Sequence, residues 1–389
     1  MHPTWGPNPP QSSSWILWQQ RSRVLLTRVG ILGDFLPPRG TPAIDWSSKA
    51  EQLQPLFDDV EVSIVNLESP VGVGDNPPAP KPGLGASLSS PDEALDYLVA
   101  LRAHVVGLAN NHIYDFGAVG ERMTSAAVRR RGMIPIGSGA TVAQQPATFV
   151  WESTTGARVG FWTCANNTLT AATGSREGVE PATIRRAREA LTMLRHGGAT
   201  CCIALLHAGL EHTDHPDPDD VSLMNGIARS GFDVVAACHS HRISGYSILE
   251  NGRPSFCFYG LGSVASGVVY SDRERAGLLL VVGLDQSGAV AQVETRPIEL
   301  DADGWGRPPA PDAAEDIRSR FLGLSRQLES GEYEREFYRD MGKALGRTQL
   351  ADFVAAFRAA GPAGVAQKLR RLRMKHVRRL FFKLVRRRR

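Results

Sequence analysis

Residues 104–117 read HVVGLANNHIYDFG, and the interpretation of the whole chain starts from this stretch. Its first part, residues 104–109, is an apolar run typical of a buried β-strand. Two asparagines and a histidine, Asn110, Asn111 and His112, follow where the strand should end. Asparagine oxygens and histidine nitrogens are both metal ligands, and α/β proteins keep their functional groups at the carboxyl ends of strands. The stretch therefore predicts a strand that ends in a metal site.

Apolar runs that resemble strands recur along the chain and alternate with stretches of helical character. This alternation is typical of an α/β protein with parallel strand pairs, so we expect the α/β fold class. The strand-like runs are 24–33, 61–66, 104–109, 133–137, 158–164, 200–206 and 233–238. The helix-like stretches are 90–103, 117–131 and 181–197. Residues 245–300 instead alternate strand and turn, with bends at Asn251-Gly252 and Gln286-Ser287-Gly288, and predict a mixed or second sheet that is largely antiparallel.

The charge of the chain is divided unevenly. Of 44 Lys and Arg residues, 12 lie in residues 368–389, where there is no acidic residue. The rest of the chain has 32 basic and 40 acidic residues, a net charge of −8. An apolar stripe through this basic tail predicts a helix, either docked on the acidic body or binding an acidic peptide segment or an anionic membrane surface. Nucleic acid is not favoured, because no aromatic residues alternate with the charges.

The totals indicate an ordinary globular protein, with 42% hydrophobic and 22% charged residues among 389. The five cysteines lie in apolar runs without CxxC spacing, which predicts buried free thiols and a cytoplasmic protein. No apolar run has the length of a secretory signal or a transmembrane anchor. We expect a disordered segment at 1–22, a catalytic domain at 23–310, and a helical extension with the basic tail at 311–389.

Polar residues follow five of the predicted strands, which is more than core packing requires. Because parallel strands end at the same edge of a sheet, these groups should converge in space. Carboxylate, amide oxygen and imidazole together suit divalent Mn, Fe or Zn, and this number of ligands suits two metals. The groups are Gly33-Asp34, Asn66-Leu67-Glu68, Asn110-Asn111-His112 with Asp115, His207 with Glu211, and His239-Ser240-His241.

In this order the motifs GD, NLE, NNHxxDxG, HxGxE and HSH resemble one known family. It is the CapA-like branch of the calcineurin-like metallophosphoesterases, the group associated with poly-γ-glutamate capsule synthesis. The resemblance spans roughly residues 28–265. It implies a four-layer α/β/β/α sandwich of two mixed sheets, followed here by the helical C-terminal extension.

The resemblance also implies roles for single residues. It assigns Asp34 and His241 to one metal ion and Asn111, His207 and His239 to the other. Glu68 takes the bridging position. His112, beside the ligand asparagine, takes the position of a general acid or base, and Asp115 would orient it. The identity of the two divalent ions is not readable, since Mn, Fe, Zn, Mg and Ca all fit such mixed ligands.

Three positions depart from the pattern of the wider superfamily. Leu36 replaces the histidine of the usual Asp-x-His, Glu68 replaces a bridging aspartate, and Gly262-Ser263 replaces a Gly-Asn pair. The first metal is therefore short of protein ligands and would bind loosely or keep open positions. Degenerate motifs of this kind, without a membrane anchor, resemble CapA-like proteins of lasso-peptide biosynthesis, which are ribosomal-peptide (RiPP) enzymes that epimerise a C-terminal tryptophan.

We therefore expect a metal-dependent peptide epimerase, an isomerase that needs no organic cofactor and inverts Cα of the C-terminal residue of a precursor peptide. Two metals would stabilise the charge that develops when Cα loses its proton, and a base on each face would exchange the proton. The alternatives are a dinuclear phosphoester hydrolase or a capsule-related CapA enzyme, and a non-catalytic peptide-binding scaffold. The candidate bases are His112, Asp115, Glu211 and His212, and the candidate substrate contacts are Arg39 and Asn110.

Overall fold

The computed structural model describes residues 14–20, 23–38, 44–80, 87–166, 168 and 170–341. The chain divides into two units, residues 1–337 and 338–389, and the architecture below is that of the first. Of the second unit only residues 338–341 are described, so the predicted basic tail lies outside the described residues, as does Arg39.

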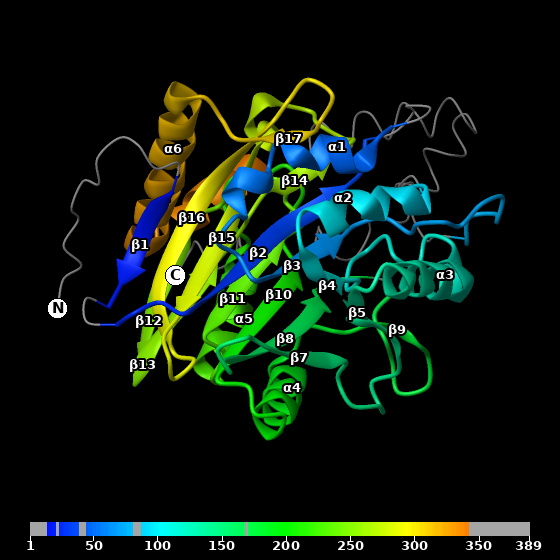
Figure 1. Cartoon of the computed structure of the whole chain (residues 1–389), viewed down its shortest axis with the longest axis horizontal. Coiled ribbons are helices and arrows are strands. Elements are labelled where there is room, and N and C mark those ends of the chain that lie inside the picture. Colours follow the sequence, from blue (N-terminus) through cyan, green and yellow to red (C-terminus); the bar gives the residue numbers. More distant parts are fainter. Residues whose placement is uncertain are drawn as a thin grey trace, which may run out of the picture. The chain divides into compact units, whose positions relative to one another are not determined.

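The first sheet has nine strands and is built around β2 (Thr27–Leu36). Strands β2 to β5 are parallel to one another, and the strands on the other side of β2 in the sheet order are antiparallel to their neighbours. The order is β1 (Trp15–Gln19), β16 (Val290–Leu300), β15 (Ala276–Leu284), β2, β3 (Val62–Leu67), β4 (Ala103–Gly107) and β5 (Ile134–Ile136) (Figure 1). Two short strands join it: β14 (Ser263–Ser266) pairs with the end of β2, and β17 (Gly306–Arg307) with β16.

The second sheet has six strands, with three parallel strand pairs at its centre and an antiparallel strand at each edge. Its order is β12 (Tyr246–Asn251), β13 (Arg253–Phe258), β11 (Val234–Cys238), β10 (Cys201–His207), β8 (Arg158–Ala165) and β7 (Thr148–Glu152). A separate pair is formed by β6 (Ser138–Ala140) and β9 (Gly178–Val179).

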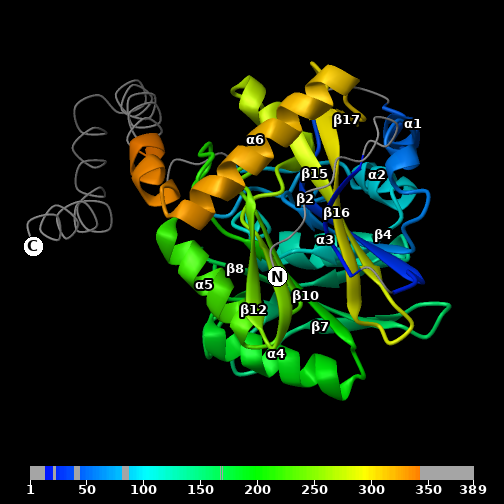
Figure 2. The ribbon, with the colours of Figure 1, turned by 90° about the vertical axis from the view of Figure 1, so that its left-hand side faces the viewer.

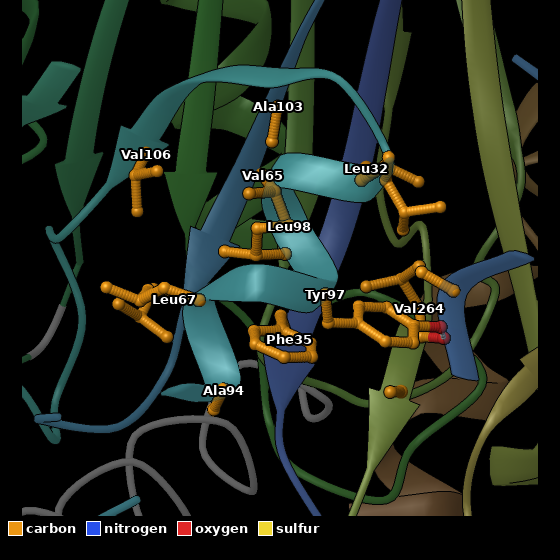
Figure 3. Close-up of a cluster of buried hydrophobic side chains, with 14 of the residues drawn as sticks. Leu32, Phe35, Val65, Leu67, Ala94, Tyr97, Leu98, Ala103, Val106 and Val264 are labelled. Atoms are coloured by element: carbon orange, nitrogen blue, oxygen red, sulfur yellow. Dashed lines mark hydrogen bonds between the residues drawn. The ribbon is translucent and has the colours of Figure 1, made fainter. Parts of the chain in front are cut away.

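The two sheets pack face to face, and helices cover their outer faces. Apolar side chains of both sheets, among them Ile64 and Val105 of the first and Ile203 and Leu205 of the second, form one buried cluster between them. Another cluster joins the first sheet to its helices, where the rings of Phe35 and Tyr97 stack with centroids 5.1 Å apart (Figure 3). A third joins the second sheet to α4 and α5 (Figure 2). This is the predicted four-layer α/β/β/α sandwich.

The helices differ in which sheet they cover. Those on the first sheet are α1 (Trp46–Glu51), α2 (Leu95–Ala100) and α3 (Gly117–Arg130). Those on the second are α4 (Ile184–His196) and α5 (Pro218–Arg229). The long α6 (Pro311–Ser330) contacts β12 and β16, one strand from each sheet. Short 3₁₀ turns are η1 (Gln54–Leu56), η2 (Asp92–Ala94) and η3 (Asp272–Arg275).

Most predicted strands are confirmed, and four expectations differ from the structure. Residues 15–19 form β1 within the segment expected to be disordered, because they pair with the long β16. The helix expected at 90–103 is shorter, a 3₁₀ turn followed by α2. The hairpins of 245–300 enter different sheets, β12–β13 the second and β15–β16 the first. Finally, α6, which we assigned to a C-terminal extension, belongs to the first unit.

Two further expectations concern the cysteines and the membrane-spanning helices. All five cysteines are buried free thiols, as the apolar runs around them predict. Within the described ranges, no helix combines the length and the apolar character that crossing a membrane requires.

Candidate metal centre

The candidate ligands lie where parallel strands of both sheets end. Asp34 is near the carboxyl end of β2, Glu68 directly follows β3, and Asn111 follows β4, all in the first sheet. His207 is the last residue of β10 and His239-Ser240-His241 follows β11, both in the second sheet. The structure brings all six ligand candidates into one cluster, with carboxylates from one sheet facing imidazoles from the other.

Asp34 is fully buried and fixed by neighbours on three sides. Its Oδ1 accepts a hydrogen bond from Asn66 Nδ2 at 2.7 Å, and its Oδ2 accepts one from the His239 backbone N–H at 2.8 Å. Burial by itself would raise the pKa of Asp34, but the imidazoles of His207 and His241 together lower it well below its usual range. The carboxylate is therefore ionised and oriented before any ligand arrives.

Position 33, in the GD motif, requires glycine for a steric reason. A Cβ at position 33 would lie 1.9 Å from the carbonyl oxygen of Gly262, which no side chain tolerates. The same carbonyl accepts the Asp34 N–H at 3.1 Å, so β2 and the segment before β14 approach closely at this point. Glycine at 33 thus permits the approach that places Asp34 in the cluster.

Glu68 is a buried carboxylate without hydrogen bonds. Neither of its side-chain oxygens has a partner among the described residues, and the residue is 1% exposed. Its oxygens lie 3.4 Å from His207 Nε2 and 3.7 Å from the Nδ1 atoms of His239 and His241. Ligands held at about 2.1 Å around a tetrahedral ion are about 3.4 Å apart, so these spacings fit a shared cation rather than direct hydrogen bonds.

The electrostatics of the cluster lead to the same conclusion. Burial, followed by the charges of Asp34, Glu211 and Asp115, raises the pKa of Glu68 well above its usual value. Burial lowers the pKa of His207, and burial with the neighbouring imidazoles lowers that of His239 well below its usual value. Neutral imidazoles are the form that binds metal, and a buried carboxylate without a counter-charge calls for a cation. The residues present therefore fit divalent ions.

The HSH segment holds its imidazoles through an unusual backbone. His239 and His241 have φ values of +107° and +56°, in the left-handed region that non-glycine residues rarely occupy. Each such residue costs about 1–3 kcal/mol, and such strain clusters at functional sites. Here it turns two nearby side chains toward Glu68, so the strained backbone serves the geometry of the cluster.

His112 and Asp115 form a dyad beside the ligand Asn111. The Nδ1 of His112 lies 2.9 Å from Oδ2 of Asp115, which also accepts the backbone N–H of Leu88 at 2.7 Å. The charge of His112 lowers the pKa values of His207 and His239, which places the dyad at their end of the cluster. Asp115 is fully buried behind His112, so it orients that imidazole rather than reaching a substrate itself.

His212 lies beside His241. The two rings have centroids 6.1 Å apart, and Nδ1 of His212 is 3.1 Å from the buried carboxylate of Glu274. The half-exposed Glu211 is more distant, with its Oε2 3.9 Å from Nε2 of His212. An exposed aromatic ring, Tyr270, packs edge-to-face on His212 with centroids 4.9 Å apart.

One candidate substrate contact is wrong. Asn110 is fully buried, and its side chain is used within the loop. Its Oδ1 accepts the backbone N–H groups of His112 and Ile113, and its Nδ2 donates to Asn66 and to the carbonyl of Leu67. Asn110 therefore shapes the loop that carries Asn111 and His112. The other candidate, Arg39, lies outside the described residues.

Four residues of the site received no role from the sequence. Asn66 donates to Asp34 and lies 3.3 Å from His207 Nδ1, and its place in the NLE motif was a usable signal. Cys238, directly before the HSH segment, lies 3.7 Å from His207 Nδ1. Ser263 lies 3.4 Å from His241 Nδ1. For Glu274, the partner of His212, no local pattern in the sequence gave a signal.

The fold is a four-layer α/β/β/α sandwich, and the cluster where its parallel strands end is a candidate site for divalent ions. Residues 26–268 match the family described as "Bacterial capsule synthesis protein PGA_cap", and the chain belongs to this family. It is similar to "Capsule biosynthesis protein CapA" of Bacillus anthracis, with 23% identity over 203 residues, 51% of this chain and 48% of the relative. The chain thus spans about half the length of this curated relative.

Three solved structures are similar at low identity. The NAD nucleotidase NadN of Haemophilus influenzae is 12% identical, with 80% of this chain and 60% of that chain covered and a TM-score of 0.45. A 5'-nucleotidase precursor from Thermus thermophilus is 13% identical, with 78% and 59% covered and a TM-score of 0.46. The calcineurin-like phosphoesterase YfkN of Bacillus subtilis is 14% identical, with 79% and 99% covered and a TM-score of 0.43.

Proposed function

We propose that this chain is a divalent-metal-dependent epimerase that inverts Cα of the C-terminal residue of a peptide. The observation that supports it is a pair of histidines outside the ligand set, each held by a buried carboxylate and each beside a different ligand candidate. His112 is next to Asn111 and is held by Asp115 at 2.9 Å, while His212 is near His241 and is held by Glu274 at 3.1 Å. Epimerisation needs such a pair, one group to remove a proton and another to return one on the opposite face.

Each histidine is prepared for proton transfer in the same way. Its Nδ1–H donates to a buried carboxylate, so Nε2 is the atom that exchanges a proton. The same carboxylate stabilises the imidazolium that forms. Both side chains are partly exposed, 16% for His112 and 20% for His212, whereas Asp34, Glu68 and His207 are buried beneath them. Divalent ions held by the cluster would bind the substrate carboxylate and stabilise the charge that develops beside Cα.

The resemblance to lasso-peptide epimerases supports a precursor peptide that ends in tryptophan as the substrate. We place the reaction in the cytoplasm, where five buried free thiols stay reduced.

Phosphoester hydrolysis is the second candidate, and the His112–Asp115 dyad favours it. In that reaction the metals supply the nucleophile, and one histidine beside them is enough to protonate the leaving group. Hydrolysis leaves His212 and its buried partner Glu274 without a role, which is why we rank it second.

The test compares His112→Ala, His212→Ala and, as a matched control, His196→Ala on the exposed end of α4. Each protein is incubated in D2O with Mn²⁺ and a peptide ending in L-tryptophan, and separately with a chromogenic phosphodiester. The intact protein and His196→Ala should introduce one deuterium and produce the D-residue. One of the two site variants should exchange deuterium without inversion, because it keeps the base for the L-face, and the other should do neither.

Two results would reject this proposal. Phosphodiester cleavage with an unlabelled peptide would assign the protein to the hydrolases. Inversion that survives in both single variants would exclude the two histidines as the bases.

A further inference from the structure

Three arginines from separate segments gather beside His212. Arg242 directly follows the HSH segment, Arg273 is in η3, and Arg320 is in α6. Asp214 joins the first two, with Oδ1 accepting from Arg242 at 3.1 Å and Oδ2 accepting from Arg273. Arg320 Nη2 donates to the backbone carbonyl of Arg273 at 3.1 Å, so the third guanidinium is tied to the same group.

The cluster is short of negative charge. Arg242 is paired with Asp214 and Glu274, and Arg273 with Asp214, but Arg320 makes no ion pair within the described part of the chain. Two N–H groups, Nε of Arg242 and Nε of Arg320, are buried and have no hydrogen-bond partner among the described residues. Three guanidinium groups against two carboxylates leave one positive charge, and a shielded cation without a counter-charge is unfavourable.

The surroundings of Arg320 agree with a missing anion. Burial, followed by the charges of Arg273 and Arg242, lowers the pKa of Arg320 to about 10. The side chain of Arg273 is 60% exposed while that of Arg242 is 12% exposed, so the cluster is open to solvent on the Arg273 side. A ligand from solution can therefore reach the cluster at Arg273, where a negative charge would balance the excess positive charge of the three guanidinium groups.

We propose that Arg242, Arg273 and Arg320 form a subsite for a carboxylate, and that it takes an acidic side chain of the substrate. One unpaired positive charge matches a carboxylate better than a phosphate, which carries about two negative charges at neutral pH. The subsite shares Glu274 with His212, so a bound acidic group would lie on the His212 side of the metal centre. The assignment of the ligand to a peptide rests on the proposed function; the carboxylate site itself does not.

The first experiment measures binding rather than turnover. The ligands are dye-labelled peptides that end in tryptophan and carry one glutamate, placed at a different upstream position in each peptide. A matching peptide has glutamine at the same position. Fluorescence anisotropy gives the Kd of each peptide for the Mn²⁺-loaded protein. At one position glutamate should bind about tenfold more tightly than glutamine. Arg320→Gln should reduce this preference to less than twofold, and Arg320→Lys should keep part of it. Arg318 is a partly exposed arginine on the same helix, and Arg318→Gln should leave the preference unchanged.

A second measurement uses no peptide. Sodium acetate should raise the thermal midpoint of the intact protein and of Arg318→Gln, relative to sodium chloride at equal ionic strength, but not that of Arg320→Gln. Inorganic phosphate would overturn the carboxylate assignment if the part of its protection that is lost in Arg320→Gln exceeds that of acetate. Equal Kd values for glutamate and glutamine at every position would overturn the substrate role.

The two proposals fail separately. Deuterium exchange without any glutamate preference would leave the epimerase proposal intact and remove the subsite. Acetate protection that depends on Arg320, in a protein that neither binds nor labels peptides, would keep the subsite and remove the peptide epimerase.

Discussion

The side chains of Asn111 and His207 meet across the two sheets, with Asn111 Oδ1 2.8 Å from His207 Nε2. Asn111 follows β4 in the first sheet and His207 ends β10 in the second. The candidate metal centre therefore lies on the seam between the sheets, and the geometry of its candidate ligands depends on both halves of the sandwich keeping their relative position.

His239→Ala should lose metal and activity together. The substitution removes one imidazole from the group that includes Glu68 and His207, and these two cannot hold an ion as tightly without it. Isothermal titration with Mn²⁺ should show at least a tenfold weaker Kd, or one ion fewer per chain. Full metal content in the variant would remove His239 from the ligand set.

His112→Ala should bind metal normally and lose turnover. The side chain of His112 is hydrogen-bonded to Asp115 and not to any of the six ligand candidates. Its removal should therefore leave the ligand cluster in place. A positioned general base contributes about 10²–10⁴-fold to a rate, and that loss should appear in kcat. An unchanged kcat with intact metal binding would exclude a catalytic role for His112.

Metal should raise the unfolding free energy of the intact protein but not that of the Glu68→Gln variant. The buried carboxylate of Glu68 has no hydrogen-bond partner among described residues, so a cation provides what the fold does not. At a free metal concentration 100 times Kd, the unfolding free energy should rise by about 2.7 kcal/mol, as measured by urea denaturation with and without chelator. His196→Ala, remote from the centre, should respond like the intact protein; an equal response from Glu68→Gln would contradict the assignment.

Glu274→Gln should weaken the fold at neutral pH and much less in acid. Burial would raise the pKa of Glu274, but hydrogen bonds from His212, the Tyr270 backbone and Arg242 lower it from 4.5 to about 2. A depressed carboxyl pKa stabilises the fold above pH 4.5, and this contribution is lost as the pH falls toward 2. Urea denaturation at pH 7, 5, 4 and 3 should give the unfolding free energies of the variant and of the intact protein. The difference between them should be about 1–3 kcal/mol at pH 7 and should narrow as the pH falls. A constant difference would mean that the carboxylate is not responsible.

The sequence predicted the parts of the site whose signal is local. A strand-like run followed directly by ligand-type residues predicted that Asp34, Glu68, Asn111 and the histidines would lie together, and the structure brings them into one cluster. Asn110 looked identical to Asn111 in such a pattern. Only the folded loop shows that one amide is bonded inward and the other reaches His207.

Features that depend on contacts between residues far apart in the chain could not be predicted from the sequence. Residues 15–19 look like part of a polar terminus until β16, whose Thr295 pairs with Trp15, offers an edge to pair with. The two C-terminal hairpins have the same strand and turn pattern, yet β12 and β13 extend the second sheet while β15 and β16 return to β2. Glu274 is likewise recognisable only through its contact with His212.

The placement of the ligands on two sheets has a consequence for how metal preference can change. Three ligands move with one sheet and three with the other, while the spacing between the sheets is set by apolar residues such as Val105 and Leu205. Enlarging or trimming those residues would change every distance across the seam at once and none within a sheet. Variants that exchange Zn²⁺ for the larger Mn²⁺ or Ca²⁺ should therefore arise in the interior of the sandwich, with all six ligands retained.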